Sequence, residues 1–158
     1  MSLPKVLKSQ ATVRFQDCDP YKHLYNSKFI DYFMNAREDD LLEYYGLDIY
    51  SVGDTEGIGW VVAQNQIAYL QPAMLMEKVW ITSKLIAYGP RSISVEFEMW
   101  NQDESILKSL MWSRFVHFDL RSRQSAVHAQ KYMDMFAEVL DPVDAQSFEE
   151  RLKEVKSN

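Results

Sequence analysis

The sequence predicts an α+β fold in which a curved antiparallel sheet of five strands wraps around one long helix. Two observations lead to this prediction. A helical pattern between residues 26 and 45 precedes four strand-like runs between residues 60 and 119, and short turns separate those runs. Short turns force neighbouring strands to pair antiparallel, and such a sheet buries one face by packing on a helix.

A fifth strand is expected before the helix. Over Ala11–Asp19 the side chains alternate, so that Val13 and Phe15 share one face of a strand. Pro20 follows and ends regular pairing, because proline has no N–H to donate to a neighbouring strand. The chain is therefore expected to leave the sheet here and to turn toward the helix.

The long helix has a start signal and a stop signal. Asn26 or Ser27 is expected to be its N-cap, because either side chain can accept a hydrogen bond from the first turn. The helix should run to about Tyr45, with Gly46 as its stop. At 1.5 Å per residue, a helix of ~20 residues spans ~30 Å, about the width of a small domain.

Four strands should follow a loop that contains glycines at positions 53, 57 and 59. They are expected from Trp60 to Leu70, from Val79 to Tyr88, from Ile93 to Met99 and from Ile106 to Asp119. Short helical segments near Ala129–Leu140 and Ala145–Val155 then close the chain. Residues 1–158 are thus interpreted as a single domain, with a core at about 10–120 and a C-terminal helical extension at about 128–156.

The composition limits the classes of function. The chain of 158 residues is 47% hydrophobic and 25% charged, as expected of one globular domain. Its net charge of −6 disfavours a nucleic-acid partner, and no apolar run approaches the ~18 residues of a membrane span. A single cysteine excludes an internal disulfide and fits a reducing compartment, so a soluble cytoplasmic protein is expected.

Two carboxylates, Asp17 and Asp19, stand between the expected first strand and the helix. A carboxylate that faces a helix start can act as a nucleophile or activate water, while unpaired N–H groups of the helix polarise a carbonyl oxygen. This combination suits hydrolysis of an activated acyl group. The alternative is that both aspartates are turn residues before Pro20, which is a common use of aspartate.

The stretch DCDPYKHLYNSKFIDYFMNAR resembles the acyl-CoA thioesterases of the hot-dog fold, in particular the 4-hydroxybenzoyl-CoA thioesterase branch. The positions that match the family pattern D-x-D-x-x-G-H-x-N-N-x-x-Y and the helix after it are Asp17, Asp19, His23, Asn26, Phe29, Tyr32 and Arg37. The stretch QNQIAYLQPAMLMEKVWI resembles the family's second strand pair in Tyr69, Pro72 and Glu77. With YGPRSISVEFEM, which resembles the start of the following strand, the resemblance covers about residues 10–120.

The resemblance implies a role for each residue of the first motif. Asp19 would attack the thioester or activate water, and the backbone N–H at Asn26 would polarise the thioester carbonyl. His23, a further catalytic candidate, and Tyr25 would line the loop between them. The alternative for His23 is a structural role that satisfies backbone groups. Asp17 would be a supporting residue that fixes the loop.

Two positions depart from the family pattern: Lys22 stands where glycine is usual, and Tyr25 stands where one branch of the family has asparagine. A non-glycine residue with a positive φ at position 22 would strain the loop or shape it differently. Lys22 and Tyr25 are placed among the substrate-binding residues. Coenzyme A needs cations for its phosphates, and the candidates are Arg91, Arg121 and Arg123. The alternative for these arginines is protection of a solvated sheet edge.

Other residues suggest weaker alternatives. His117 and Asp119 share a strand face and could form a dyad, but a surface pair is favoured because nothing near them in the sequence indicates a site. Cys18 is disfavoured as a nucleophile, because flanking carboxylates raise the pKa of a thiol. The motif has no second cluster of ligands at recognised spacing, so no metal is expected.

The resulting interpretation is an acyl-CoA thioesterase that releases a free acid and CoA with the help of Asp19. It would act on an acyl-CoA or acyl-carrier-protein thioester and need no cofactor, since coenzyme A enters as part of the substrate. A homodimer or homotetramer is expected, with each active site at a subunit interface, because edge-to-edge pairing would hide the outer strands. Two alternatives are an enoyl-CoA hydratase on the same fold and a non-catalytic module that binds acyl-CoA or a carrier protein.

Overall fold

The sheet has the predicted architecture, with five antiparallel strands in the order β1-β3-β4-β5-β2. The computed structural model describes residues 2–157. Its strands are β1 (Val6–Thr12), β2 (Ile58–Tyr69), β3 (Lys78–Tyr88), β4 (Ser92–Trp100) and β5 (Leu107–Asp119). A two-residue strand, β6 (Gln124–Ser125), pairs with the end of β5. Strands β1 and β2 are the outer strands of the sheet.

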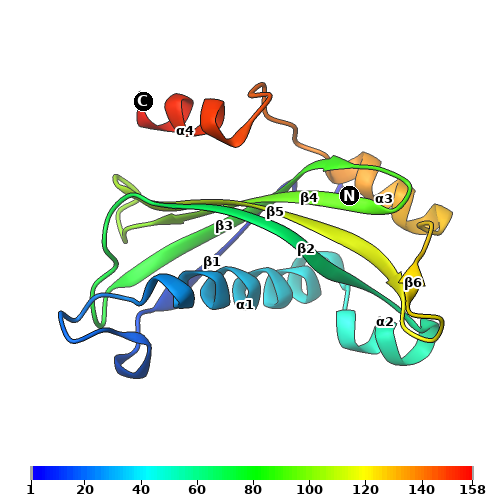
Figure 1. The fold of residues 1–158 in the computed structure, drawn as a ribbon, viewed down its shortest axis with the longest axis horizontal. Coiled ribbons are helices and arrows are strands. Elements are labelled where there is room, and N and C mark those ends of the chain that lie inside the picture. The colour runs from blue at the N-terminus through cyan, green and yellow to red at the C-terminus, as the bar shows by residue number, and fades with distance from the viewer. Residues whose placement is uncertain (1, 158) are drawn as a thin grey trace.

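The helix α1 (Asn26–Tyr45) lies along the inner face of the sheet, which curves around it (Figure 1). The side chains that α1 buries recur every three or four positions, a spacing that places them on one face of a helix: Phe29, Phe33, Ala36, Arg37 and Asp40. Phe33 packs on Phe97 of β4, with ring centroids 5.4 Å apart. This layer of helix and curved sheet is the hot-dog arrangement that the resemblance implies.

The stop signal of α1 is confirmed, whereas its start signal is displaced. Gly46 has a φ of 65°, a left-handed conformation that glycine adopts without a steric cost. Tyr25 is the N-cap in place of Asn26 or Ser27, and its side chain makes no capping hydrogen bond. The entry of the chain into the helix is fixed instead by the backbone, because the Tyr25 N–H donates to the carbonyl of Asp17 at 3.0 Å.

The prediction of a strand over Ala11–Asp19 is wrong. β1 ends at Thr12, and the chain then turns through the 3-10 helix η1 (Phe15–Asp17). Phe15, which was expected to share one strand face with Val13, is 80% exposed, whereas Val13 is fully buried. A strand needs a neighbouring strand as its hydrogen-bonding partner. Val6–Thr12 pair with β3, whereas the chain beyond Val13 turns away from the sheet.

Between α1 and β2 the structure has a helix where the sequence predicts a glycine-containing loop. This helix, α2 (Ile49–Glu56), is capped by Asp48, whose carboxylate accepts hydrogen bonds from two N–H groups of the first turn. Gly57, with a φ of 70°, ends it. An aspartate before a helix and a glycine after it are ordinary helix signals, but a second glycine, Gly53, lies inside the helix and obscures them in the sequence.

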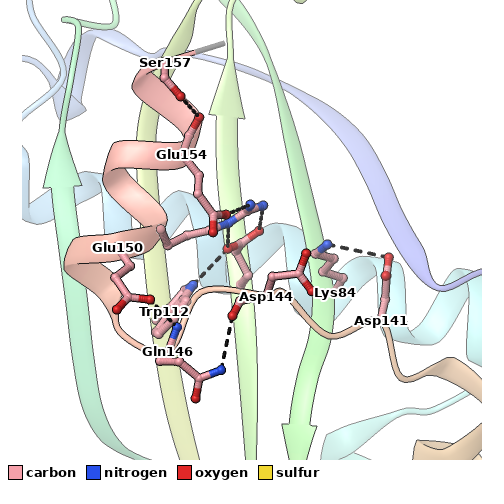
Figure 2. A network of polar contacts seen from close by, with 10 residues as sticks. Lys84, Trp112, Asp141, Asp144, Gln146, Glu150, Glu154 and Ser157 are labelled. Atoms are coloured by element: carbon pink, nitrogen blue, oxygen red, sulfur yellow. Dashed lines mark hydrogen bonds and ion pairs between the residues drawn. The ribbon is translucent and has the colours of Figure 1, made fainter.

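The C-terminal helices α3 (Gln130–Val139) and α4 (Phe148–Lys156) confirm the two predicted helical segments. α3 adds Tyr132, Phe136 and Val139 to the core cluster that contains Phe33. α4 lies on the outer face of the sheet, on the side away from α1 (Figure 1), and a network of polar contacts joins it to that face (Figure 2). None of the helices within residues 2–157 combines the length and the apolar character needed to cross a membrane.

Candidate functional site

The loop between β1 and α1 is folded around the carboxylate of Asp19. Asp19 Oδ1 accepts hydrogen bonds from the backbone N–H groups of Tyr21 and His23, at 2.9 and 3.0 Å. The Asp19 backbone also donates to the carbonyl of His23 and accepts from the N–H of Lys22. One carboxylate oxygen therefore performs the turn role that was the alternative to catalysis.

The second carboxylate oxygen of Asp19 is available to a ligand. In the described part of the chain Oδ1 alone takes part in the hydrogen bonds of this side chain. Asp19 lines a pocket of about 210 Å³ between the loop, the first turn of α1 and the end of β2. The other residues that line it are His23, Leu24, Asn26, Phe29, Tyr69, Leu70, Gln71 and Pro72. The three predicted catalytic residues, Asp19, His23 and Asn26, thus meet at one pocket.

Tyr69 of β2 ties the start of α1 to the sheet. Its hydroxyl donates to the backbone carbonyl of Asn26 at 3.0 Å, and its ring meets Phe29 edge-on with centroids 5.2 Å apart. Burial raises the pKa of the Tyr69 phenol, so the hydroxyl keeps its proton. Because no side chain caps α1, the first N–H groups of the helix stay open, and the helix dipole adds a partial positive charge beside the pocket.

Asp17 supports the loop from outside the pocket wall. Asp17 Oδ2 accepts a hydrogen bond of 2.6 Å from the hydroxyl of Tyr32, which itself accepts from the N–H of Arg14 at 3.1 Å. Burial and the bond to Asp17 raise the pKa of Tyr32 to about 12, so the phenol remains a donor at neutral pH. Through its carbonyl, Asp17 also holds Tyr25 at the helix start. Its contacts are those of a residue that positions others.

Lys22 adopts the left-handed conformation that glycine would adopt freely. Its φ is 66°, and its side chain is exposed. The carbonyl of Lys22 accepts from the N–H of Leu75, and the N–H of Leu24 donates to the carbonyl of Ala73, so the loop is fastened to the connection between β2 and β3. Tyr25 is 45% exposed beside this loop. Both predicted substrate-binding residues of the loop therefore present their side chains to solvent.

An ion pair beneath the β2–β3 connection was missed by the sequence reasoning. Lys108 Nζ lies 2.9 Å from Glu77 Oε2 and donates to the carbonyl of Pro72 at 2.8 Å. Glu77 Oε1 accepts from the N–H of Met74. Pro72 and Glu77 belong to the second stretch that resembles the family, whereas Lys108 lies on a strand far from either motif and carries no local signal.

The three arginines expected to hold coenzyme A phosphates lie far from Asp19 in the same chain. Arg121 and Arg123 follow β5, beside the first residue of β2, and the backbone carbonyl of Arg91 pairs with β5 close to the same end. The Asp19 pocket adjoins the last residue of β2. β2 has 12 residues, so at ~3.3 Å per residue its two ends lie ~36 Å apart. One chain alone does not bring these arginines to the pocket.

The expectation of a surface pair at His117 and Asp119 is wrong. His117 is 1% exposed and stacks on His128, with ring centroids 4.5 Å apart. Asp119 instead holds the turn after β5, where its Oδ1 accepts from the N–H groups of Arg121 and Ser122. His128 lies beyond the predicted core of the fold, and nothing local in the sequence joins it to His117.

Cys18 is a half-buried thiol whose Sγ donates to the carbonyl of Arg14 at 3.3 Å. Burial and the charges of Asp17 and Asp19 raise the pKa of this thiol, as expected, so it stays protonated and weakly nucleophilic. Over residues 2–157, no three His, Cys, Asp or Glu side chains gather closely enough to hold a metal ion.

Known proteins share this fold. A 1,4-dihydroxy-2-naphthoyl-CoA thioesterase from Synechocystis superposes with a TM-score of 0.76 at 14% identity, over 87% of this chain and 99% of its own. The probable thioesterase YbaW from Escherichia coli gives 0.72 at 22% identity, over 85% and 99%. A hypothetical protein from Staphylococcus aureus in complex with CoA gives 0.80 at 12% identity, over 96% and 94%. No curated protein sequence matches the chain.

The family assignment comes from the sequence itself. The model of the thioesterase-like superfamily matches residues 13–141, from the start of the Asp19 loop to the end of α3. This stretch includes every residue that lines the Asp19 pocket. The chain belongs to the thioesterase-like superfamily.

Proposed function

We propose that the chain hydrolyses an acyl-CoA thioester, with Asp19 as the nucleophile or as the general base for a water molecule. One observation carries this proposal: a single pocket is lined both by Asp19, whose Oδ2 makes no hydrogen bond in the described chain, and by Asn26, the first residue of α1, a helix without a side-chain cap. Membership of the thioesterase-like superfamily supports thioester hydrolysis as the class of reaction.

The helix start and Asp19 act on different atoms in the same step: the helix start acts on the carbonyl oxygen of the thioester, and Asp19 acts at its acyl carbon. N–H groups at the helix start stabilise the negative charge that develops on the carbonyl oxygen. As a general base, Asp19 takes a proton from water while the water oxygen bonds to the acyl carbon. The C–S bond then breaks, and the departing thiolate takes up the proton. As a nucleophile, Asp19 bonds to the acyl carbon itself, the C–S bond breaks, and CoA leaves as a thiolate. Water then cleaves the resulting anhydride, which releases the free acid, restores the Asp19 carboxylate and supplies the proton that the thiolate takes up.

The remaining residues of the loop and the pocket would surround the bound thioester. His23 lines the pocket next to Asp19, where its ring can contact the thioester. Lys22 and Tyr25 flank it on the exposed side of the loop. Phe29 and Tyr69 offer an apolar wall to the acyl group.

Coenzyme A as the thiol carrier is supported by two of the similar structures. The Synechocystis protein is a thioesterase for an aromatic CoA ester, and the Staphylococcus aureus protein is in complex with CoA. We therefore favour a CoA thioester over an acyl-carrier-protein thioester.

A second copy of the chain completes the proposed site. β2 is an outer strand, and Val61 and Val62 on it are 42% and 46% exposed. When two copies pair β2 with β2 about a two-fold axis, the strands run antiparallel, so the first residue of one β2 meets the last residue of the other. The three arginines of one copy then approach the Asp19 pocket of the other, where they can bind the phosphates of CoA. Two such dimers would form the tetramer.

The direct test is thiol release from a panel of aromatic and aliphatic acyl-CoAs. Asp19→Asn keeps an Oδ1 acceptor for Tyr21 and His23, so the loop should stay folded. We expect turnover to fall by about 10²–10⁴, the usual contribution of general acid–base catalysis. Asp54→Asn, an exposed aspartate on α2, is the matched control and should keep full activity.

Each other outcome contradicts a stated part of the proposal. Near-full activity of Asp19→Asn would remove Asp19 from its role. Hydration of crotonyl-CoA without thiol release would identify a hydratase. Binding of CoA analogues without turnover of any thioester would identify a non-catalytic module.

A further inference from the structure

A second cavity, of about 140 Å³, lies between the second half of α1, the inner face of the sheet and α3. Its wall is largely apolar and includes Met34, Leu41, Leu85, Val95, Phe115 and Phe136. In the described chain it shares no lining residue with the Asp19 pocket. Met34 follows Asn26 by eight residues, which is about 12 Å along a helix.

Two charged side chains, Arg37 and Glu38, lie in this wall, and of the two only Arg37 is buried. Arg37 is 9% exposed, and its Nη1 donates to Ser83 Oγ at 3.0 Å. Within residues 2–157 this is the only hydrogen bond of its guanidinium, and no carboxylate oxygen lies within 4.0 Å of it. A guanidinium carries five N–H donors, and a buried arginine is normally paired through several of them.

The nearest acids do not neutralise this guanidinium by direct contact. Asp40, one turn further along α1, is 1% exposed, and its Oδ2 accepts from Ser9 Oγ at 3.1 Å. In the described chain, Asp40 Oδ1 is the only solvent-inaccessible side-chain oxygen or nitrogen that has no hydrogen-bond partner. The free nitrogens of Arg37 are not sealed in this way, and Arg37 is one of the residues that line the cavity. Glu38 lies on the wall but is half-buried.

The charge of Arg37 persists at neutral pH. Burial lowers its pKa to about 10, while the nearby Tyr45 and Asp40 act in the opposite direction. The cavity wall thus contains a permanent cation whose remaining donors have no hydrogen-bond acceptor within residues 2–157.

We propose that this cavity binds a small carboxylic acid, with its carboxylate on Arg37 and its apolar body among the wall side chains. Arginine binds carboxylates through two parallel N–H···O bonds, which matches the donors that Arg37 leaves free. An apolar cavity of ~150 Å³ accommodates a benzene molecule, so the body of the ligand is about six carbon atoms in size. Benzoate and hexanoate represent this class. The site is independent of thioester hydrolysis, because no bond is made or broken there.

Benzoate and benzamide provide a matched pair of probes that needs no variant. Both have the same ring and shape, but benzamide carries no charge to offer Arg37. We expect titration calorimetry on the wild-type chain to show saturable benzoate binding, at least tenfold tighter than benzamide. Equal affinity for the two, or no saturable benzoate binding, would overturn the proposal.

Methyl NMR spectra of the methionines show where on the protein benzoate binds. Met34 and Met135 line this cavity, whereas Met74 pairs with His23 beside the Asp19 loop. Benzoate should shift the Met34 and Met135 signals with one common dissociation constant and leave Met74 unchanged. Shifts of Met74 alone would place the ligand in the Asp19 pocket and would also overturn the proposal.

Two variants then test the cation and the space separately. Arg37→Met removes the charge and should abolish the preference for benzoate over benzamide. Ile93→Phe keeps Arg37 but adds volume to a half-buried wall residue, so it should weaken both ligands. Arg114→Met, an exposed arginine outside this cavity, is the control and should bind benzoate like the wild type. Undiminished benzoate binding in both test variants would refute the site even if Arg37→Met folds less stably.

Discussion

His117 and His128 form a stacked pair in the interior, with ring centroids 4.5 Å apart and an interplanar angle of 29°. His128 Nε2 accepts a hydrogen bond from the indole N–H of Trp60 at 3.0 Å. In the neutral ring the proton is therefore on Nδ1, which donates to the carbonyl of Gly89. The stack joins β5 and β2 to the segment that leads into α3. It is held together by neutral imidazoles.

The first prediction is that stability falls as the pH drops below about 6.5, the ordinary pKa of histidine. Burial lowers the pKa of both histidines, and the charge of His128 lowers that of His117 further, against weaker opposing contributions from Gly59, Gly89 and Glu56. Because both folded-state pKa values lie below the unfolded one, the unfolded chain binds more protons as the pH falls. The contribution is complete above the unfolded pKa and is lost through the folded pKa.

Urea unfolding at a series of pH values measures this effect. Each histidine contributes a slope of at most about 1.4 kcal/mol per pH unit. His128→Gln should flatten the profile between pH 7.5 and 5, because one titrating ring is gone and the charge on His117 is no longer opposed by a second one. A wild-type slope in that variant would show that other groups cause the pH dependence.

The second prediction concerns Lys22, whose φ of 66° strains any residue with a Cβ. Lys22→Gly should raise the free energy of unfolding by about 0.5–1 kcal/mol, since the relief of ~1–2 kcal/mol is partly offset by the greater freedom of glycine in the unfolded chain. Lys22→Ala, which keeps the Cβ, is the control. If the alanine variant were as stable as the glycine variant, the backbone would not be under strain at this position.

The third prediction concerns the attachment of α4 to the outer face of the sheet. Arg151 meets Glu96 through two bonds of 2.8 and 2.9 Å, and the indole N–H of Trp112, labelled in Figure 2, donates to the same carboxylate at 2.9 Å. Glu96 is 1% exposed, so Arg151→Met leaves a buried and poorly paired carboxylate. The loss in unfolding free energy should be about 3–5 kcal/mol.

Two further variants separate the buried charge from the mere loss of a contact. Adding Glu96→Gln to Arg151→Met removes the stranded charge and should recover most of the loss. Asp141→Asn breaks the more exposed pair with Lys84, at 3.7 Å, and should cost less than ~1 kcal/mol. A similar loss for Arg151→Met and Asp141→Asn would contradict the importance of burial.

The success of the sequence-based prediction depended on how local each feature is. The four later strands and α1 were predicted because alternation and glycine stops lie within the elements themselves. The bounds of the first strand were wrong because the run after Ala11 alternates, whereas Val6–Thr12, which forms β1, has no alternating pattern and is defined by its pairing with β3, about 70 residues later. Pairing across such a separation leaves no mark in a short window.

The candidate site shows the same division. Asp19, His23 and Asn26 lie within one motif of eight residues, so the sequence places them together. The opposite wall of the pocket, from Tyr69 to Pro72, is supported by the hydrogen bond from Lys108 to the Pro72 carbonyl. Both features depend on how the fold places β2 and β5 beside the Asp19 loop. Arg37 illustrates the limit: the motif contains it, but only the folded chain shows it unpaired in an apolar cavity.

The last prediction concerns the hydrogen bond from the Tyr69 hydroxyl to the Asn26 carbonyl, which holds the start of α1 against the pocket. Tyr69→Phe keeps the ring on Phe29 and should cost only about 1 kcal/mol of unfolding free energy. Because small displacements of a catalytic donor reduce rates strongly, kcat should fall by up to about tenfold with little change in KM. The matched control is Tyr44→Phe, which removes a hydroxyl bond to the Lys8 carbonyl at the far end of the same helix. Equal kcat values in the two variants would show that the position of the helix start does not limit the reaction.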